Sequence, residues 1–419
     1  MLRVLRQQVY RRLFCAQILA LIGSGLATVA LGLVAYDLAG ADAGTVLGTA
    51  LAIKMVAYVL APLASAALAR LPSRRIMVGS DLVRFAAALS LPFVDQVWQI
   101  YLLIFVLQAA SATFTPTFHA VIPQVLKRDE DYTNALSLSR LAYDLESVFA
   151  PFLAAVLLLV VSSETLFLGT AAGFVASAVL VVSVALPRQV SDDAAERTSF
   201  PARVTLGMRV FLGARPLRAL MALHLVVASA GAFVLVQTYV IVQDVFGAGE
   251  GTVALALGAN GLGSMLAALA LPRVLRRVPE RRVMLPATIL LIGPLLAFPL
   301  VTNAPPGVAL VVLCGLWVVM GVGWSAIETP AGRLIRSHVE PADLRAAFAA
   351  QFSLSHACWL VTYPLAGWLG SSGHLTRASW TLAAVAGFAA VAAVVIWRGE
   401  REPTTPGQDE IDAATTASR

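Results

Sequence analysis

Twelve apolar stretches of about 18 residues or more constrain the fold of this chain more than any other feature. A membrane-spanning helix needs about 20 mostly apolar residues. Hydrophobic residues make up 59% of the chain and charged residues only 13%, whereas ordinary soluble domains carry roughly 25% charged residues. The sequence therefore predicts an all-α polytopic membrane protein with 12 transmembrane helices, at about 13–36, 45–69, 76–94, 98–118, 134–161, 164–186, 217–242, 252–271, 282–301, 307–326, 346–369 and 378–397.

The positions of lysine and arginine agree with this number of spans, because cytoplasmic loops are enriched in both residues. With twelve spans, 26 of the 30 Lys and Arg residues fall in loops on one side, and only Arg377 falls in a loop on the other. The remaining three, Lys54, Arg84 and Arg140, lie within spans. We therefore expect both termini in the cytoplasm. The first apolar run is too long for a signal peptide, so we expect it to be retained.

Composition and motifs argue against several other classes of protein. The net charge of +6 lies in short loops between spans, which orients a membrane protein, so we expect no nucleic-acid partner. No G-x-x-x-x-G-K-[ST] motif for a nucleotide-driven pump occurs. The three cysteines lie in spans and the five histidines are scattered, without metal-ligand spacing. We expect no cofactor and no metal site.

The chain divides into two similar halves joined by a polar linker. Thr115-Pro116, Ser137-Leu138-Ser139-Arg140 and Pro151 recur as Thr329-Pro330, Ser353-Leu354-Ser355-His356 and Pro364. Parallel repeats of this kind place a substrate site near the midplane between the halves. We expect an amino-terminal bundle at 1–186, a cytoplasmic linker at 187–216, a carboxy-terminal bundle at 217–397 and a disordered cytoplasmic tail at 398–419.

The fifth span carries charged residues at membrane depth. Arg140 and Asp144 are spaced i,i+4 and can pair along one helix face, whereas Glu146 projects elsewhere. Lys54 in the second span lies at a similar depth. Ionisable side chains there face protein or water and often serve transport. We interpret Asp144, Glu146, Arg140 and Lys54 as a proton-coupling network; the alternative is a static set of buried ion pairs.

Two motifs resemble those of the major facilitator superfamily, and the resemblance covers nearly the whole chain. The loop after the second span has Ser65, Arg70, Arg74 and Arg75 where that family has a small residue and arginines, but Ala69 replaces the usual acidic residue. Ala150-Pro151 with Ala154 and Ala155 is similar to the antiporter motif of the fifth helix, with alanines in place of glycines. The arginine common in the fourth helix of proton antiporters is replaced by Phe105.

This resemblance implies two six-helix bundles related by a pseudo-two-fold axis, in a monomer of a bacterial inner membrane. In this fold, spans one, four, seven and ten line a central cavity. Candidate cavity-lining residues are Gln17, Ser24, Thr28, Gln108, Ser111, Thr115, His224 and Gln237; hydrogen bonding between helices is the alternative. Asp81 and Arg84 are expected to support the arginine loop, and Glu328 to act as a cytoplasmic latch.

The function expected from these observations is secondary active transport. We expect a proton-coupled efflux antiporter of a small molecule or drug. The stretches FTPTFHAVIP and YTNALSLSRLAYDLE also resemble bacterial nickel-resistance permeases, so a nickel or cobalt exporter is the alternative. A solute importer and an integral-membrane enzyme are further alternatives. An enzyme needs acid, base and nucleophile together at one membrane interface, whereas the acidic groups here lie at depth.

Overall fold

The structure is a computed structural model that describes residues 2–67, 71–126, 128, 160–184, 200–340 and 343–398, with scattered positions between 131 and 158. All regular elements within these residues are helical. Eleven α-helices of 18 or more residues correspond to eleven of the twelve predicted spans: α1 (Gln8–Ala39), α2 (Ala43–Ala67), α3 (Ser73–Ser90), α4 (Val97–Val125), α6 (Ser163–Val182), α9 (Arg215–Val240), α10 (Glu250–Val274), α11 (Glu280–Ala297), α13 (Pro306–His338), α14 (Leu344–Gly370) and α15 (Leu375–Trp397).

The predicted fifth span, 134–161, is described only in part. Glu146, Ala150 and Ala154 are among its described positions, and each is helical. Predicted residues Arg70, Arg140, Asp144, Pro151 and Ala155 lie outside the described residues, as do most of the predicted linker and the tail from 399 onward. The shorter elements are η1 (Leu2–Arg6), η2 (Gly40–Asp42), η3 (Leu91–Phe93), α8 (Phe200–Gly213), η4 (Ile241–Val245), α12 (Pro299–Thr302) and η5 (Ser371–Gly373).

The outer surface of the helices is apolar, as a lipid-facing surface requires. Large hydrophobic side chains such as Ile289, Val311 and Phe388 are 70%, 70% and 79% exposed. Length and hydropathy mark nine stretches of the described residues as able to cross a membrane, and one of them, Gln8–Leu60, runs through both α1 and α2. The protein is therefore an all-α, multi-span membrane protein.

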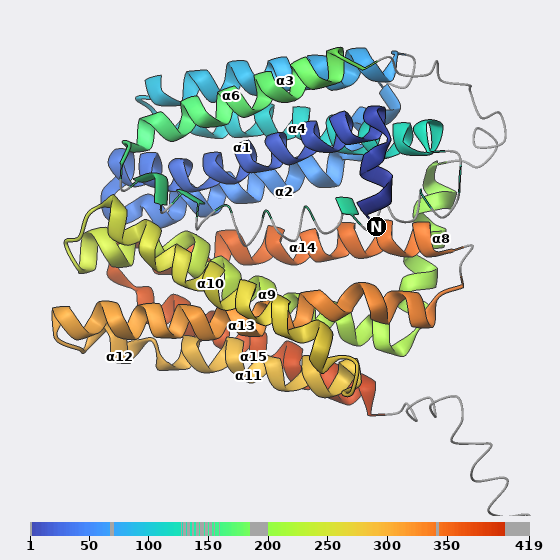
Figure 1. The fold of residues 1–419 in the computed structure, drawn as a ribbon. Coiled ribbons are helices and arrows are strands. Elements are labelled where there is room, and N and C mark those ends of the chain that lie inside the picture. Colours follow the sequence, from blue (N-terminus) through green and yellow to red (C-terminus); the bar gives the residue numbers. More distant parts are fainter. Residues whose placement is uncertain are drawn as a thin grey trace, which may run out of the picture.

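The helices pack in two groups (Figure 1). In the first, α1 packs on α6, and α3 packs on both α4 and α6. In the second, α9 packs on α14 and α15, and α13 packs on α10 and α11. Helix α14 lies along the boundary, where it packs on α2 of the first group. This boundary is the place where residues from both halves of the sequence meet.

Glycines allow the two groups to approach closely at one end of the boundary. A Cβ atom on Gly48 of α2 would lie 2.6 Å from the backbone oxygen of Tyr363 in α14, and a Cβ on Gly44 would lie 2.9 Å from the amide of Gln237 in α9. The turns η2 and η5 also touch here. We call this region the closed end, defined by Gly44, Gly48, Gln237, Gly367 and Gly370.

The opposite end, which we call the arginine-rich end, holds arginines that bind the last carbonyl groups of helices. Arg12 Nη1 donates to the Ser183 oxygen at 2.8 Å, and Arg74 donates to the Val182 oxygen, so two arginines cap α6. In the second group, Arg333 Nη1 donates to the Leu275 oxygen after α10 at 2.7 Å. Cationic side chains at helix carboxy termini satisfy free carbonyls and favour the helix dipole.

Candidate transport site

Lys54 lies on α2 beside a small internal cavity. The cavity has a volume of about 10 Å³, and its wall includes Thr28 of α1, Gln108 of α4 and Lys54 itself. This is roughly the room that one water molecule needs. Thr28 and Gln108 were both expected to line a cavity, and the structure places them together with the ammonium group. Lys54 is partly buried, and an ammonium group withdrawn from water requires polar partners because its transfer from water is costly.

Glu146 of the partly described fifth span is an acidic partner within electrostatic reach of Lys54. The close packing of α1 helps to place it. A Cβ atom on Gly25 would lie 3.2 Å from Glu146 Oε1 and would overlap the side chain of Ala150. The absence of a side chain at Gly25 therefore lets the carboxylate and Ala150 approach α1, the helix whose Thr28 lines the cavity beside Lys54.

Aromatic side chains connect Lys54 to the second helix group. The Lys54 ammonium lies 5.9 Å from the ring centroid of Tyr58, one turn further along α2. The Tyr58 ring meets the imidazole of His356 in α14 edge to face, with centroids 5.3 Å apart, and His356 packs on Phe352 at 4.0 Å. This series of rings crosses the boundary between the two groups, so a movement of α2 against α14 changes the surroundings of Lys54.

A second polar cluster lies within the second helix group. His224 of α9 is 2% exposed, and its Nδ1 lies 2.9 Å from Glu328 Oε1 of α13. The other ring nitrogen, Nε2, lies 3.2 Å from the amide nitrogen of Gln351 in α14. Three helices therefore supply one connected cluster. Glu328 was expected to be a latch at the cytoplasmic end; here it contacts a buried histidine.

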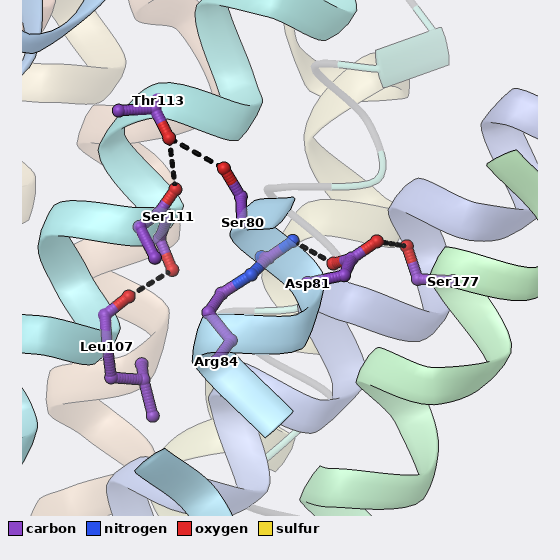
Figure 2. A network of polar contacts seen from close by, with 8 residues as sticks. Ser80, Asp81, Arg84, Leu107, Ser111, Thr113 and Ser177 are labelled. Carbon is purple, nitrogen blue, oxygen red and sulfur yellow. Dashed lines mark hydrogen bonds and ion pairs between the residues drawn. The ribbon is translucent and has the colours of Figure 1, made fainter. Parts of the chain in front are cut away.

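Asp81 and Arg84 form a buried ion pair inside the first helix group (Figure 2). Asp81 also accepts a hydrogen bond from Ser177 of α6 at 2.8 Å. The Arg84 guanidinium lies between the rings of Phe114 and Phe174, 4.5 and 4.6 Å from their centroids. The pair joins α3, α4 and α6. Arg74 of the arginine loop binds the end of α6, and a role of Asp81 and Arg84 in supporting that loop stays a prediction.

The other predicted residues lie outside the Lys54 cavity wall. Gln17 is buried and accepts a hydrogen bond from Ser139 at 3.1 Å. Ser111 donates to the Leu107 oxygen of its own helix at 3.0 Å. Gln237 lies at the closed end, where its amide nitrogen donates to the Ala366 oxygen at 2.6 Å. The remaining placements are Ser24 and Thr115, partly buried; Ala150 and Ala154, buried; Ser65 within α2; and Arg75 exposed.

Tyr58 and Gln351 are site residues that sequence analysis did not single out. Tyr58 follows Lys54 by four residues, so it shares a helix face with it. His356 stands in the second repeat where Arg140 stands in the first. These two signals were present in the sequence, whereas nothing in it pairs Gln351 with His224. Among the described residues, no group of three His, Cys, Asp or Glu side chains could hold a metal ion.

The apolar exterior, the two helix groups and the ionisable side chains buried within and between them define a multi-span membrane protein of the transporter class. Residues 13–327 match the Major Facilitator Superfamily. The chain therefore belongs to this superfamily of secondary transporters, and it is not an enzyme.

Comparisons with individual proteins agree with this assignment. An uncharacterized MFS-type transporter, YfiS of Bacillus subtilis (strain 168), is 25% identical over 299 residues, which cover 68% of each chain. The solved structure of a point mutant of nucleoside transporter NupG has a TM-score of 0.70 at 14% identity and covers 93% of this chain and 100% of its own. An inward-facing bacterial homologue of the lysosomal transporter Spinster has a TM-score of 0.69 at 14% identity, covering 95% and 99%. These two likenesses show the fold.

Proposed function

We propose that this protein is a proton-coupled efflux antiporter of a small organic molecule in a bacterial inner membrane. The observation that carries the proposal is the electrostatic interaction of Lys54 with Glu146, both partly buried, and the connection of Lys54 to α14 by Tyr58 and His356. Opposite charges buried at this depth are costly unless they are paired. A proton taken up by the carboxylate and a substrate bound near the ammonium therefore influence one another through this pair.

The two halves, 1–186 and 217–397, would move as bodies about the boundary between α2 and α14. The arginine distribution of the sequence assigns the arginine-rich end to the cytoplasm and the closed end to the outside. In this orientation the outer side is sealed at Gly44, Gly48 and Gln237. The contact of Gly25 with Ala150, in the segment that resembles an antiporter motif, supports exchange.

An organic substrate is favoured over a divalent metal ion. The half-buried rings of Tyr58 and His356 meet across the boundary, and ring faces bind apolar and aromatic groups. A metal would need several oxygen, nitrogen or sulfur ligands at one point. Among the described residues, no three His, Cys, Asp or Glu side chains come together in a group that could hold a metal ion.

The test is a resistance screen in a bacterial host that expresses the protein, over organic toxicants and salts of nickel and cobalt. The proposal expects resistance to at least one organic compound, together with lowered accumulation that a protonophore restores. Glu146→Gln and Lys54→Met should each remove the resistance at normal protein level, whereas Glu340→Gln, at an exposed loop position, should not. Resistance to metals alone, or export that is indifferent to the protonophore, would contradict the proposal.

A further inference from the structure

The cluster of His224, Glu328 and Gln351 lies deep within the second helix group. His224 comes nine residues after the start of α9 at Arg215, and Glu328 comes ten residues before the end of α13 at His338. At 1.5 Å per residue both lie about 14 to 15 Å from the arginine-rich end. Their agreement in depth, from helices that run in opposite directions, places the two side chains at one level of the membrane.

The hydrogen bonds of His224 define which ring nitrogen carries its proton. The Gln351 amide nitrogen can only donate, so Nε2 of His224, at 3.2 Å, accepts through its lone pair. The proton of the neutral ring is then on Nδ1, which donates to the Glu328 carboxylate at 2.9 Å. Both ring nitrogens therefore have a hydrogen-bond partner. Nε2 takes part through its lone pair, and a proton can add to this lone pair when the Gln351 amide no longer donates to it.

We infer that His224, Glu328 and Gln351 form a second proton-binding site, in which Nε2 of His224 is loaded when the Gln351 amide turns to present its oxygen. A proton from hydronium adds to the Nε2 lone pair: an O–H bond of the hydronium breaks, an N–H bond forms and a water molecule is released. The imidazolium then donates to Gln351 through Nε2 and to Glu328 through Nδ1. Gln351 acts as a positioning residue, because its amide orientation matches one charge state of the ring.

With an ionised Glu328 in both forms, loading changes the net charge of the cluster from −1 to zero. A neutral ion pair crosses a closed, water-poor state at lower cost than an uncompensated carboxylate. The inference thus rests on the proposed function for its role in transport, and it adds a proton carrier in the second half of the molecule. The residues around Lys54 supply the carrier in the first half.

Other charged groups near the site come from few helices. Within the described residues, His356 of α14 interacts electrostatically with Lys54, Glu328 and His224, and Cys358 of α14 interacts with Glu328. Lys54 lies in the middle of α2, which also packs on α9. The other acidic and basic residues on elements packed on α9 lie toward the ends of those elements: Arg11, Arg12 and Asp37 on α1, Asp42 on η2, Arg203 and Arg209 on α8, Asp244 on η4, Glu250 and Arg273 on α10, Glu280, Arg281 and Arg282 on α11, Arg333, Arg336 and His338 on α13, Arg345 on α14, and Arg377 on α15. Glu328 is therefore the carboxylate closest to the imidazole among these groups.

Nitrogen NMR of the full chain, purified with isotope-labelled histidine, tests the site without any substrate. The His224 signal is assigned by its loss in His224→Gln. At about pH 8 it should show the Nδ1–H tautomer, and toward about pH 5 it should convert to imidazolium. Glu328→Gln should abolish the conversion to imidazolium or move it to a different pH, whereas Glu340→Gln should leave it unchanged.

Two results would overturn the site: an Nε2–H tautomer at about pH 8, or a His224 ring that stays neutral to about pH 5 while the fold is intact. The wild-type titration decides the matter if Glu328→Gln does not fold. This test is separate from that of the proposed function. Export indifferent to a protonophore would contradict the proposed function and leave the proton site standing, while a neutral His224 would remove the site and leave coupling to Glu146 and Lys54.

Discussion

The buried pair of Asp81 and Arg84 shows how strongly single residues constrain the first helix group. Asp81 is fully buried, and the Arg84 side chain is 4% exposed between two phenylalanine rings. Removal of one member leaves the other charge buried without its partner, which typically costs about 3–5 kcal/mol. We therefore expect Arg84→Met to lower the free energy of unfolding by about this amount, measured by denaturation in detergent.

Two companion variants separate charge from packing at this site. Asp81→Asn combined with Arg84→Met removes both charges, so it should recover a large part of the lost stability. Ser177→Ala deletes only one hydrogen bond to a charged group, worth about 1.5–3 kcal/mol. Arg84→Met protein as stable as wild type would show that the ion pair does not brace the group.

Some of the site residues could be identified from the sequence and others could not, for physical reasons. Charges within an apolar span are conspicuous because burial makes them costly, so Lys54, Asp81, Arg84 and Glu146 were all identified. Lys54 and Glu146 were grouped by their similar depth, but other partners on neighbouring helices were not identified, because spacing along one helix says nothing about its neighbours. Asp81 and Arg84 are i,i+3 and could be paired, whereas the contacts of His224 with Glu328 and Gln351 join residues more than 100 positions apart.

At the scale of helices, the glycines of the closed end control how near α2 and α14 can approach. Gly48→Ala would place a Cβ atom 2.6 Å from the Tyr363 oxygen. Overpacking costs about 1–3 kcal/mol, and this free-energy cost applies only to the arrangement in which this end is closed. We expect the population with this end closed to fall relative to the open one by about 5- to 150-fold.

Spin-label distances between Asp42→Cys and His374→Cys, both exposed and on opposite sides of the boundary, measure this population. Gly79→Ala is the matched control, because a Cβ atom at Gly79 meets nothing within 4 Å. Gly48→Ala with the same distance distribution as the control would mean that this contact does not limit closure.

The helix boundaries illustrate what hydropathy alone can locate. The apolar runs of the sequence predicted the eleven long helices that the structure describes, because a helix that spans the membrane must be both long and apolar. Their polar extensions were missed: α1 begins at Gln8 rather than near residue 13, and α13 continues to His338, beyond the predicted end at 326. Both extensions lie at the arginine-rich end. Helix residues there meet lipid headgroups and water instead of the hydrocarbon core, so they need not be apolar.

For the whole molecule, the orientation in the membrane is a separate prediction. We expect the turns that hold Asp42 and Asp95 to face the outside, and the loop that holds Arg277 to face the cytoplasm, because 26 of 30 Lys and Arg residues lie on one side. In a cysteine-free background, an impermeant thiol reagent applied to intact cells should label Asp42→Cys and Asp95→Cys and spare Arg277→Cys. The reverse pattern would invert the assignment.

Coupling of substrate movement to protons is the property on which the proposed function depends. It is measured with purified protein in sealed vesicles that hold a pH gradient and an internal pH dye, using an organic compound found in the resistance screen. Addition of the compound should dissipate the gradient with wild-type protein, and Lys54→Met and Glu146→Gln should prevent this while Glu340→Gln does not. Wild-type protein that moves the compound across the vesicle membrane without any proton movement would contradict the antiport mechanism.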